Sequence, residues 1–512
     1  MSAPFDPEAA GGSQVLIRGQ IFRGISWASG TRLFGLVLQM ASAAVIARYL
    51  ASGDIGLIGF AAIFIAFLSR FTNFGIEAAI IQRGQLDGNV LTTAFTLQGA
   101  LAVTAFVASL MIAPFGQVLI GHEGAGGVIV ALGSIFLINV LGFIPTCLLT
   151  RELNYGRLSL AQASRALGRG LFVIGLVLLG FGYWGIVIAD IVAAVVFLLS
   201  LGWAHPWVLR PGFDKNAARA LLNFAAPIFA CNLLVFVLFN ADNFAIGSVL
   251  GATMLGYYVI AFNWGSMICG ILGETVNSVL FPAFSKIQKN IDEMRHLYLK
   301  TLERVGFVAV LVNTCLLAGA HDFLVVFLGK GSEKWLPAVT CLQVLSVYGM
   351  LRALTEPLAN VMLALGKTRT LFTANVVAAL IELGLMAPAL YWYGINGVSV
   401  LVLIAYGAQL WLYVPFVLRQ LSMRLRELLG IVVPLAIASG VSVYATSLAL
   451  PHGSEVSWLS LALRVVVTAI TVMLVHGVLT SFRIFRDACE VVAWIARSSR
   501  GAPSMHLESV EE

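Results

Sequence analysis

The chain has 512 residues, of which 59% are apolar and 11% are charged, whereas a soluble globular domain carries roughly 25% charged residues. The apolar residues form long blocks, and most charged residues lie between these blocks. This composition excludes a soluble globular domain, a disordered chain and a disulfide-stapled secreted fold. The net charge of +6 does not indicate nucleic acid as a partner, because the basic residues form no cluster. The composition indicates an integral membrane protein.

The apolar blocks predict transmembrane helices. A bilayer core of about 30 Å is crossed by roughly 20 apolar residues in a helix, and the chain contains about fourteen blocks of this kind. Because the blocks are continuous runs, helices are favoured over the short alternating strands of a β-barrel. We expect the spans to begin near Ile21, Ile55, Val90, Val128, Ser159, Tyr183, Ala217, Leu255, Leu302, Leu336, Leu371, Ile395, Leu428 and Leu459.

The basic residues are distributed unequally between the two sides of the predicted spans. If the N-terminus is inside, the outer side receives only four of them, namely Arg48, Lys330, Lys334 and Arg464. The positive-inside rule then places both termini in the cytoplasm, which requires an even number of spans.

Two charged stretches have an amphipathic pattern, and no cofactor or metal site is expected. Ser285 to Arg304 and Ser481 to Arg497 are predicted to be helices on the cytoplasmic interface. The cysteines lack C-x-x-C spacing and the histidines are scattered, so they do not predict a metal site. Gly366-Lys367-Thr368 is not a nucleotide-binding loop, because Val361 occupies the position of the required first glycine.

The two halves of the chain contain a weak repeat in a consistent order. At a shift of 200 residues, Leu33, Ile46, Leu50, Gly56 and Ala61 recur as Leu233, Ile246, Leu250, Gly256 and Ala261. At a shift of 212, Pro145 recurs as Pro357, and the turn at 182–185 recurs at 394–397. Corresponding spans begin on the same side of the membrane, which predicts a parallel repeat with an axis along the membrane normal.

The repeat predicts two pseudo-symmetric six-helix bundles plus two C-terminal helices. The expected organisation is a cytoplasmic tail (1–20), an N-terminal bundle (21–205), a cytoplasmic linker (206–216), a C-terminal bundle (217–420), two additional transmembrane helices (421–480) and an amphipathic cytoplasmic C-terminal segment and tail (481–512).

Several motifs along the chain resemble one family in the same order. They are Ile46-Ala47-Arg48-Tyr49-Leu50, Asp54-Ile55-Gly56, Asn73-Phe74-Gly75, Arg151-Glu152-Leu153-Asn154-Tyr155, Asn240-Ala241-Asp242-Asn243, Gly256-Tyr257-Tyr258, Phe281-Pro282-Ala283-Phe284-Ser285 and Ala364-Leu365-Gly366-Lys367. Together they resemble the bacterial polysaccharide and O-antigen repeat-unit flippases of the multidrug, oligosaccharidyl-lipid and polysaccharide exporter superfamily.

This resemblance implies a protein of the bacterial cytoplasmic membrane that serves exopolysaccharide, capsule or O-antigen synthesis. The implied substrate is an oligosaccharide linked to undecaprenyl diphosphate, which is moved from the inner to the outer leaflet by alternating access. The implied partners are this lipid-linked oligosaccharide, membrane lipids, and polysaccharide polymerase and export machinery.

Charged residues inside predicted spans are candidate substrate ligands, because each costs about 2.5–3.5 kcal/mol near the bilayer centre on insertion scales. Arg32 lies in the first span, while Arg70, Asn73 and Glu77 are expected on one face of the second. An arginine fork binds phosphate oxygens bidentately, so Arg32 and Arg70 are candidates for binding a diphosphate. Alternatively, Arg70 and Glu77 form a structural ion pair.

The C-terminal half contains further candidates. Arg352 and Glu356 are four residues apart and either bind substrate or pair with one another. Asn232, Asn240, Asp242 and Asn263 suit sugar hydroxyls, but they also suit hydrogen bonds between helices. Asp190 and Glu382 are isolated in the sequence and are candidates for coupling to a proton or a sodium ion.

Three other functions are compatible with parts of this pattern. An ion-coupled drug or metabolite antiporter has the same fold. A membrane glycosyl polymerase or ligase is disfavoured because the predicted outer loops are short and nearly uncharged. A non-transporting scaffold is disfavoured because it has no need for intramembrane arginines. The sequence therefore favours a transporter and not an enzyme.

Overall fold

The computed structural model describes residues 35, 38–82, 87–152, 154–207, 210–288, 290–330, 332–450 and 456–481. All regular secondary structure in these ranges is helical. Ten of the helices are long and apolar enough to cross a membrane, or up to eleven if one bent pair is a single span. The prediction of an all-α integral membrane protein is confirmed, while the count of about fourteen spans stays a prediction.

The first described helix covers residues 38–49. The helices that follow are α2 (Ser52–Thr72), α3 (Ile76–Gln82), α4 (Gly88–Ile120), α5 (Ala125–Leu141), α6 (Phe143–Arg151), α7 (Tyr155–Leu178), α8 (Tyr183–Ala204), α9 (Lys215–Lys286), α10 (Ile291–Ala318), α11 (Ala320–Asp322), the π-helix Phe323–Leu328, the 3-10 helix Glu333–Ala338, α12 (Val339–Ala364), α13 (Thr368–Gln420), α14 (Leu425–Ala449) and α15 (Trp458–Leu479).

Two of the longest helices are interrupted at glycines. α9 has a non-helical residue at Gly251, with φ 82° and ψ 177°, and α13 has one at Gly394, with φ 56° and ψ −140°. Gly182, which precedes α8, has nearly the same angles as Gly394, φ 55° and ψ −139°. Positive φ favours glycine because it has no Cβ. Gly182 and Gly394 are repeat mates at the shift of 212, so the sequence repeat extends here to the backbone conformation.

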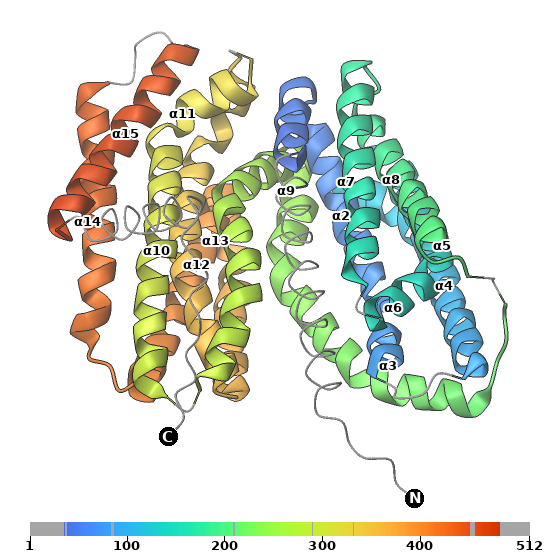
Figure 1. Cartoon of the computed structure of the whole chain (residues 1–512). Helices are drawn as coiled ribbons and strands as arrows, with labels where there is room; N and C mark the ends of the chain where they lie inside the picture. The colour runs from blue at the N-terminus through green and yellow to red at the C-terminus, as the bar shows by residue number, and fades with distance from the viewer. Residues whose placement is uncertain are drawn as a thin grey trace, which may run out of the picture. The chain divides into compact units, whose positions relative to one another are not determined.

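Contacts divide the chain into two compact units (Figure 1). Unit 1 comprises Met1–Trp264, Leu324–Leu342 and Ala379–Ala405, and in it α2, α4, α5, α7 and α8 pack together. Unit 2 comprises Gly265–Phe323, Gln343–Ala378 and Tyr406–Glu512, and in it α10, α14 and α15 pack together. The predicted bundles at 21–205 and 217–420 stay a prediction.

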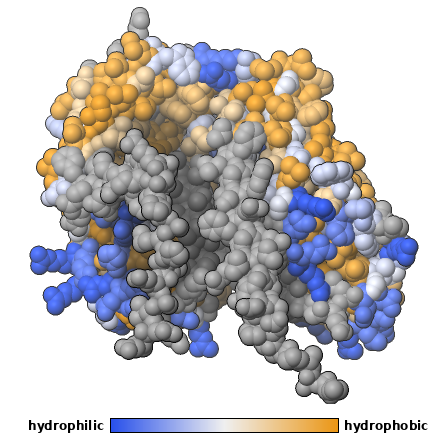
Figure 2. Space-filling view, in the orientation of Figure 1, coloured by the Kyte–Doolittle hydropathy of each residue, from blue (hydrophilic) through white to orange (hydrophobic). Residues whose placement is uncertain are grey.

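Large apolar side chains are exposed on helices of both units, as expected of a surface that faces lipid. Examples are Leu179 at 74% exposure, Trp203 at 75%, Trp411 at 79% and Tyr444 at 67%. Figure 2 shows hydrophobic residues over much of the described surface, with hydrophilic residues gathered in the lower part of the view and in a smaller group at the top. This distribution agrees with helices that cross an apolar layer.

The charged start of α10 is continuous with its apolar part. Met294, Tyr298 and Leu302 are fully buried in the apolar core of unit 2, so this stretch is not a separate interfacial helix. The prediction of such a helix over 285–304 is wrong, because one face of this stretch is buried against its neighbours.

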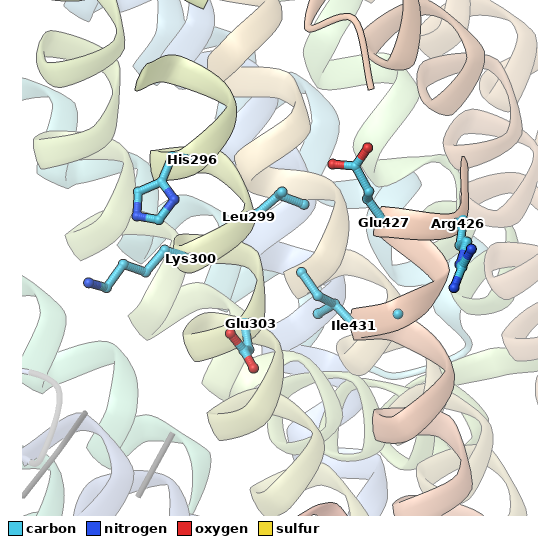
Figure 3. Close-up of a pocket in the computed structure, with 8 residues that line it drawn as sticks. His296, Leu299, Lys300, Glu303, Arg426, Glu427 and Ile431 are labelled. Carbon is cyan, nitrogen blue, oxygen red and sulfur yellow. The ribbon is translucent and has the colours of Figure 1, made fainter. Parts of the chain in front are cut away.

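A cavity lies between the first turns of α10 and the start of α14 (Figure 3). The predicted amphipathic helix at 481–497 lies almost entirely outside the described residues.

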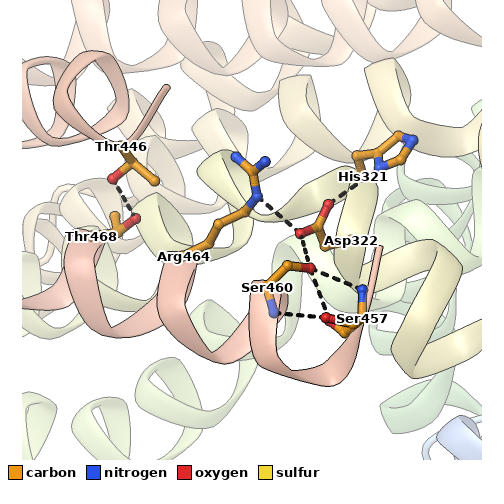
Figure 4. A network of polar contacts seen from close by, with 7 residues as sticks. All are labelled: His321, Asp322, Thr446, Ser457, Ser460, Arg464 and Thr468. Carbon is orange, nitrogen blue, oxygen red and sulfur yellow. Dashed lines mark hydrogen bonds and ion pairs between the residues drawn. The ribbon is translucent and has the colours of Figure 1, made fainter. Parts of the chain in front are cut away.

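A buried polar network attaches α15 to α11, the short helix that follows α10 (Figure 4). Arg464 Nε donates to Asp322 Oδ2 at 2.9 Å, and Ser460 Oγ donates to the same oxygen at 2.9 Å. The side chains of Arg464 and Asp322 are only 3% and 5% exposed. Lipid provides no hydrophobic force between helices, so such polar contacts specify how the additional helices pack.

Candidate functional site

Arg70 is a partly buried cation in the last turn of α2. Its Cζ lies 5.6 Å from the centroid of the Phe236 ring of α9, and Phe236 is 5% exposed. The Nε atom of Arg70 is buried and has no hydrogen-bond partner among the described residues. The aromatic ring stabilises the positive charge but leaves this donor unsatisfied. Arg70 can therefore accept an anionic ligand as a hydrogen-bonding partner.

The structure corrects the predicted grouping of Arg70 with Asn73 and Glu77. α2 ends at Thr72, Gly75 has φ 101°, and α3 begins at Ile76, so the three residues do not share one helical face. Asn73 and Glu77 are exposed, and no ion pair joins Arg70 to Glu77 among the described residues. The alternative of a structural Arg70–Glu77 pair is therefore wrong.

α2 and the first part of α9 meet along a seam that relates the two repeats. A Cβ on Gly56 would lie 1.7 Å from the carbonyl oxygen of Ala252, and a Cβ on Gly256 would lie 1.9 Å from that of Ser52. Gly53 faces Thr253 in the same way at 3.6 Å. Gly53 and Thr253 are repeat mates at the shift of 200, and the same shift exchanges the Gly56–Ala252 contact with the Gly256–Ser52 contact. The local two-fold axis therefore passes between Gly56 and Gly256, where the helices cross at their closest approach.

The seam continues along α2 through aromatic pairs. Phe60 stacks on Phe244 with ring centroids 6.1 Å apart, and Phe74, which follows the end of α2, stacks on Phe229 at 4.6 Å. A Cβ on Gly75 would touch Ala225 at 3.4 Å. The seam is thus closed from one end of α2 to the other.

A second cluster, at the end of the first described helix, involves the segment before α12. Arg48 Nε donates to the carbonyl of Phe327 at 2.6 Å. Lys334 Nζ donates to the carbonyls of Arg48 and Leu50 at 3.0 and 3.1 Å, and Trp335 Nε1 donates to that of Ala47 at 3.1 Å. A lysine at these last carbonyls satisfies groups that a helix end otherwise leaves without partners.

Asp242 is a buried carboxylate surrounded by neutral donors. It is 4% exposed, and it accepts hydrogen bonds from Tyr258 Oη at 2.7 Å and from the backbone N–H of Asn243 at 2.7 Å. No basic side chain within the described ranges pairs with it. Glu382 of α13 is close enough to interact with it electrostatically. Two carboxyl groups that interact in this way repel one another when both are ionised.

The interpretation of Asp190 as an isolated carboxylate is wrong. Arg169 Nε of α7 donates to Asp190 Oδ1 of α8 at 2.5 Å, and the two side chains are partly exposed. Asp190 therefore joins two neighbouring helices of unit 1 through an ion pair.

Arg352 and Glu356 of α12 form the ion pair that their spacing allows. Arg352 Nε lies 3.6 Å from Glu356 Oε1, and Arg352 Nη1 lies 3.4 Å from Tyr348 Oη. Tyr348 packs edge-on against Tyr406 with ring centroids 4.8 Å apart. Arg352 thus belongs to a polar and aromatic cluster within unit 2.

The remaining predicted site residues do not converge on one place. Asn240 Nδ2 donates to the Phe236 carbonyl of its own helix at 2.9 Å, and Asn263 is exposed. Asn232 lies in α9, but its side chain is outside the described part of the structure, as is all of Arg32. The sequence did not indicate that Tyr258 contacts Asp242 or that Arg169 contacts Asp190; Tyr258 was expected in an aromatic belt at the membrane interface, whereas it is fully buried.

The helical fold of this membrane protein is similar to that of a solved structure. The solved structure titled "Lipid II flippase MurJ, inward closed conformation" aligns with a TM-score of 0.71 and 13% identity over 90% of this chain and 99% of that chain.

Residues 45–340 match the family described as "Polysaccharide biosynthesis protein", which is more than half of the chain. The chain belongs to this family, and the resemblance seen in the sequence motifs is confirmed. It is 25% identical to the lipopolysaccharide biosynthesis protein WzxC of Escherichia coli (strain K12) over 73% of this chain and 77% of the relative. It is 24% identical to the teichuronic acid biosynthesis protein TuaB of Bacillus subtilis (strain 168) over 69% and 73%.

Proposed function

We propose that this protein is a flippase that moves an oligosaccharide repeat unit, linked to a lipid diphosphate, across the bacterial cytoplasmic membrane. The observation that carries the proposal is the family match over residues 45–340, together with relatives named for the synthesis of two different surface polysaccharides. The protein contributes transport and not catalysis. A polysaccharide polymerase and export machinery are the proposed partners on the outer side.

Arg70 is the proposed ligand of the diphosphate among the described residues. Its partly buried guanidinium contacts an aromatic ring, pairs with no carboxylate in the described ranges, and retains a donor without a partner. A phosphate oxygen supplies the missing acceptor through a charge-assisted hydrogen bond. Arg32 stays a second candidate from the sequence alone.

The closed seam between α2 and α9 supports alternating access. The distribution of basic residues predicts that both termini are cytoplasmic and that Gly56 and Gly256 lie toward the outer side. In this orientation, substrate can leave toward the outer leaflet only when α2 and α9 separate at Gly56 and Gly256. The hydrogen bonds of Arg48 and Lys334 must also break. A rocking mechanism needs these contacts to form in one state and to break in the other.

Asp242 and Glu382 are the proposed site of ion coupling. The two carboxyl groups interact within unit 1, and Asp242 has no basic partner among the described residues. A proton or a sodium ion bound there relieves their repulsion, so ion occupancy can bias the conformation of α9 and α13. Asp190 is not proposed for this role, because Arg169 already compensates it.

Transport of undecaprenyl-diphosphate-linked oligosaccharide into reconstituted vesicles tests the assignment of Arg70. Arg70→Ala is expected to lower the rate of flipping about tenfold or more, because a charge-assisted hydrogen bond is worth about 1.5–3 kcal/mol. Arg70→Lys is expected to recover part of the rate, since lysine keeps the charge but loses the planar fork. Arg369→Ala removes an exposed arginine of α13 and serves as the control.

Adding Glu77→Ala to Arg70→Ala is not expected to restore transport, because the two side chains form no pair. Flipping by Arg70→Ala at the rate of the unmodified protein would place the diphosphate site elsewhere. Export of cationic drugs without any flipping would instead favour the antiporter.

A further inference from the structure

The cavity between α10 and α14 combines apolar and charged walls. It has a volume of about 660 Å³ and lies entirely within unit 2. Leu299 and Ile431 lie between the two helices, with Lys300 on the α10 side and Arg426 on the α14 side (Figure 3). A cavity of this size is in the range that holds a small organic ligand.

The charges that line the cavity leave an excess of positive charge. Glu427 accepts hydrogen bonds from the Arg295 guanidinium and from the backbone N–H of Arg424, so its own charge is compensated. Lys300 and Arg426 are exposed and appear in no ion pair recorded among the described residues. Glu303 is the one lining carboxylate without such compensation in these ranges. With His296 as a further donor, the cavity favours an anion.

The cavity also lies at the depth of a lipid headgroup. In α10 the residues after Arg304 carry no charge to the end of the helix, and the same is true of α14 after Glu427. The two helices pack side by side, so their charged turns are at one end and their apolar turns follow together. Leu429 and Val433 of α14 are 45% and 43% exposed. Charged turns followed by exposed apolar turns mark the boundary between headgroups and acyl chains.

We propose that this cavity binds the headgroup of an anionic phospholipid. The lipid headgroup lies between the side chains of Lys300 and Arg426, which flank the cavity from α10 and α14, and the first methylenes of the acyl chains lie against Leu299 and Ile431. Basic cavities between transmembrane helices are a recurrent way to recognise such headgroups. The inference concerns a resident lipid and does not depend on the substrate of the flippase.

Binding is tested on the purified full-length protein in neutral detergent, by following its thermal unfolding as lipid is added. The probes are dioctanoyl phosphatidylglycerol, dioctanoyl phosphatidylcholine and inorganic phosphate. Phosphatidylglycerol is expected to raise the unfolding temperature in a saturable way, because a ligand that binds the folded state stabilises it. Arg426→Gln and Lys300→Gln are each expected to weaken its apparent affinity about tenfold.

Arg369→Gln is the matched control, since Arg369 is exposed in unit 2 and does not line the cavity. Each variant must have the same unfolding temperature without lipid as the unmodified protein. The Lys300 and Arg426 variants are tested independently, so that misfolding of one does not decide the result. Equal stabilisation by phosphatidylcholine, full stabilisation by inorganic phosphate, or unchanged affinity in both variants would each overturn the proposal.

Discussion

The crossing of Gly56 and Gly256 makes the sharpest prediction about the transport cycle. In Gly56→Ala the new Cβ would lie 1.7 Å from the carbonyl oxygen of Ala252. An ordinary carbon–oxygen contact is about 3.3–3.6 Å, so the two backbones must separate by about 1.6 Å or more at this point. Overpacking of this kind costs about 1–3 kcal/mol, which shifts the ratio of closed to open seam by about 5–150-fold.

The seam can be measured with a disulfide between Gly53→Cys and Thr253→Cys, because a Cβ at position 53 would lie 3.6 Å from Thr253 Oγ1. The pair is expected to cross-link rapidly and to arrest transport until it is reduced. Adding Gly56→Ala is expected to slow cross-linking at least about fivefold. Gly99→Ala is the control, because a Cβ there meets open space. Cross-linking as fast with Gly56→Ala as without it would refute the close crossing.

The other contacts give three further predictions. Asp322→Asn is expected to lower the free energy of unfolding by about 3–5 kcal/mol in a denaturant titration, because it leaves Arg464 buried with a weaker partner; a change below about 0.5 kcal/mol would contradict a buried pair. Asp190→Asn is expected to leave the ion dependence of transport intact, and loss of that dependence in vesicles would return Asp190 to the coupling site. In intact cells, a cysteine at Gly124 is expected to react with an impermeant maleimide and one at Arg424 is not, and the reverse pattern would invert the topology.

The fold was largely predictable from the sequence because its determinants are local or repetitive. Apolar block length alone predicts helices in a membrane, and α2, α4, α8 and α15 satisfy that test. The repeat could also be detected in the sequence, since Gly182 and Gly394 both have a positive φ, which favours glycine at this position in both halves.

The site was less predictable because its partners come from different helices. The sequence gives no sign that Arg169 of α7 reaches Asp190 of α8, or that Tyr258 reaches Asp242 beyond the bend at Gly251. The helical-face argument for Arg70 and Glu77 failed because α2 ends at Thr72 and Gly75, with φ 101°, separates it from α3. Spacing predicts neighbours only inside an unbroken helix, as for Arg352 and Glu356.

The central claim, that this protein flips a lipid-diphosphate-linked oligosaccharide, is tested most directly in vesicles that contain the purified full-length chain. Undecaprenyl diphosphate bearing a labelled oligosaccharide is placed in both leaflets, and the label in the outer leaflet is removed by an impermeant glycosidase. Flipping is expected to expose the protected half to the enzyme at a rate that rises with the amount of protein and falls with Arg70→Ala. Protection that stays the same as in protein-free vesicles would contradict the claim.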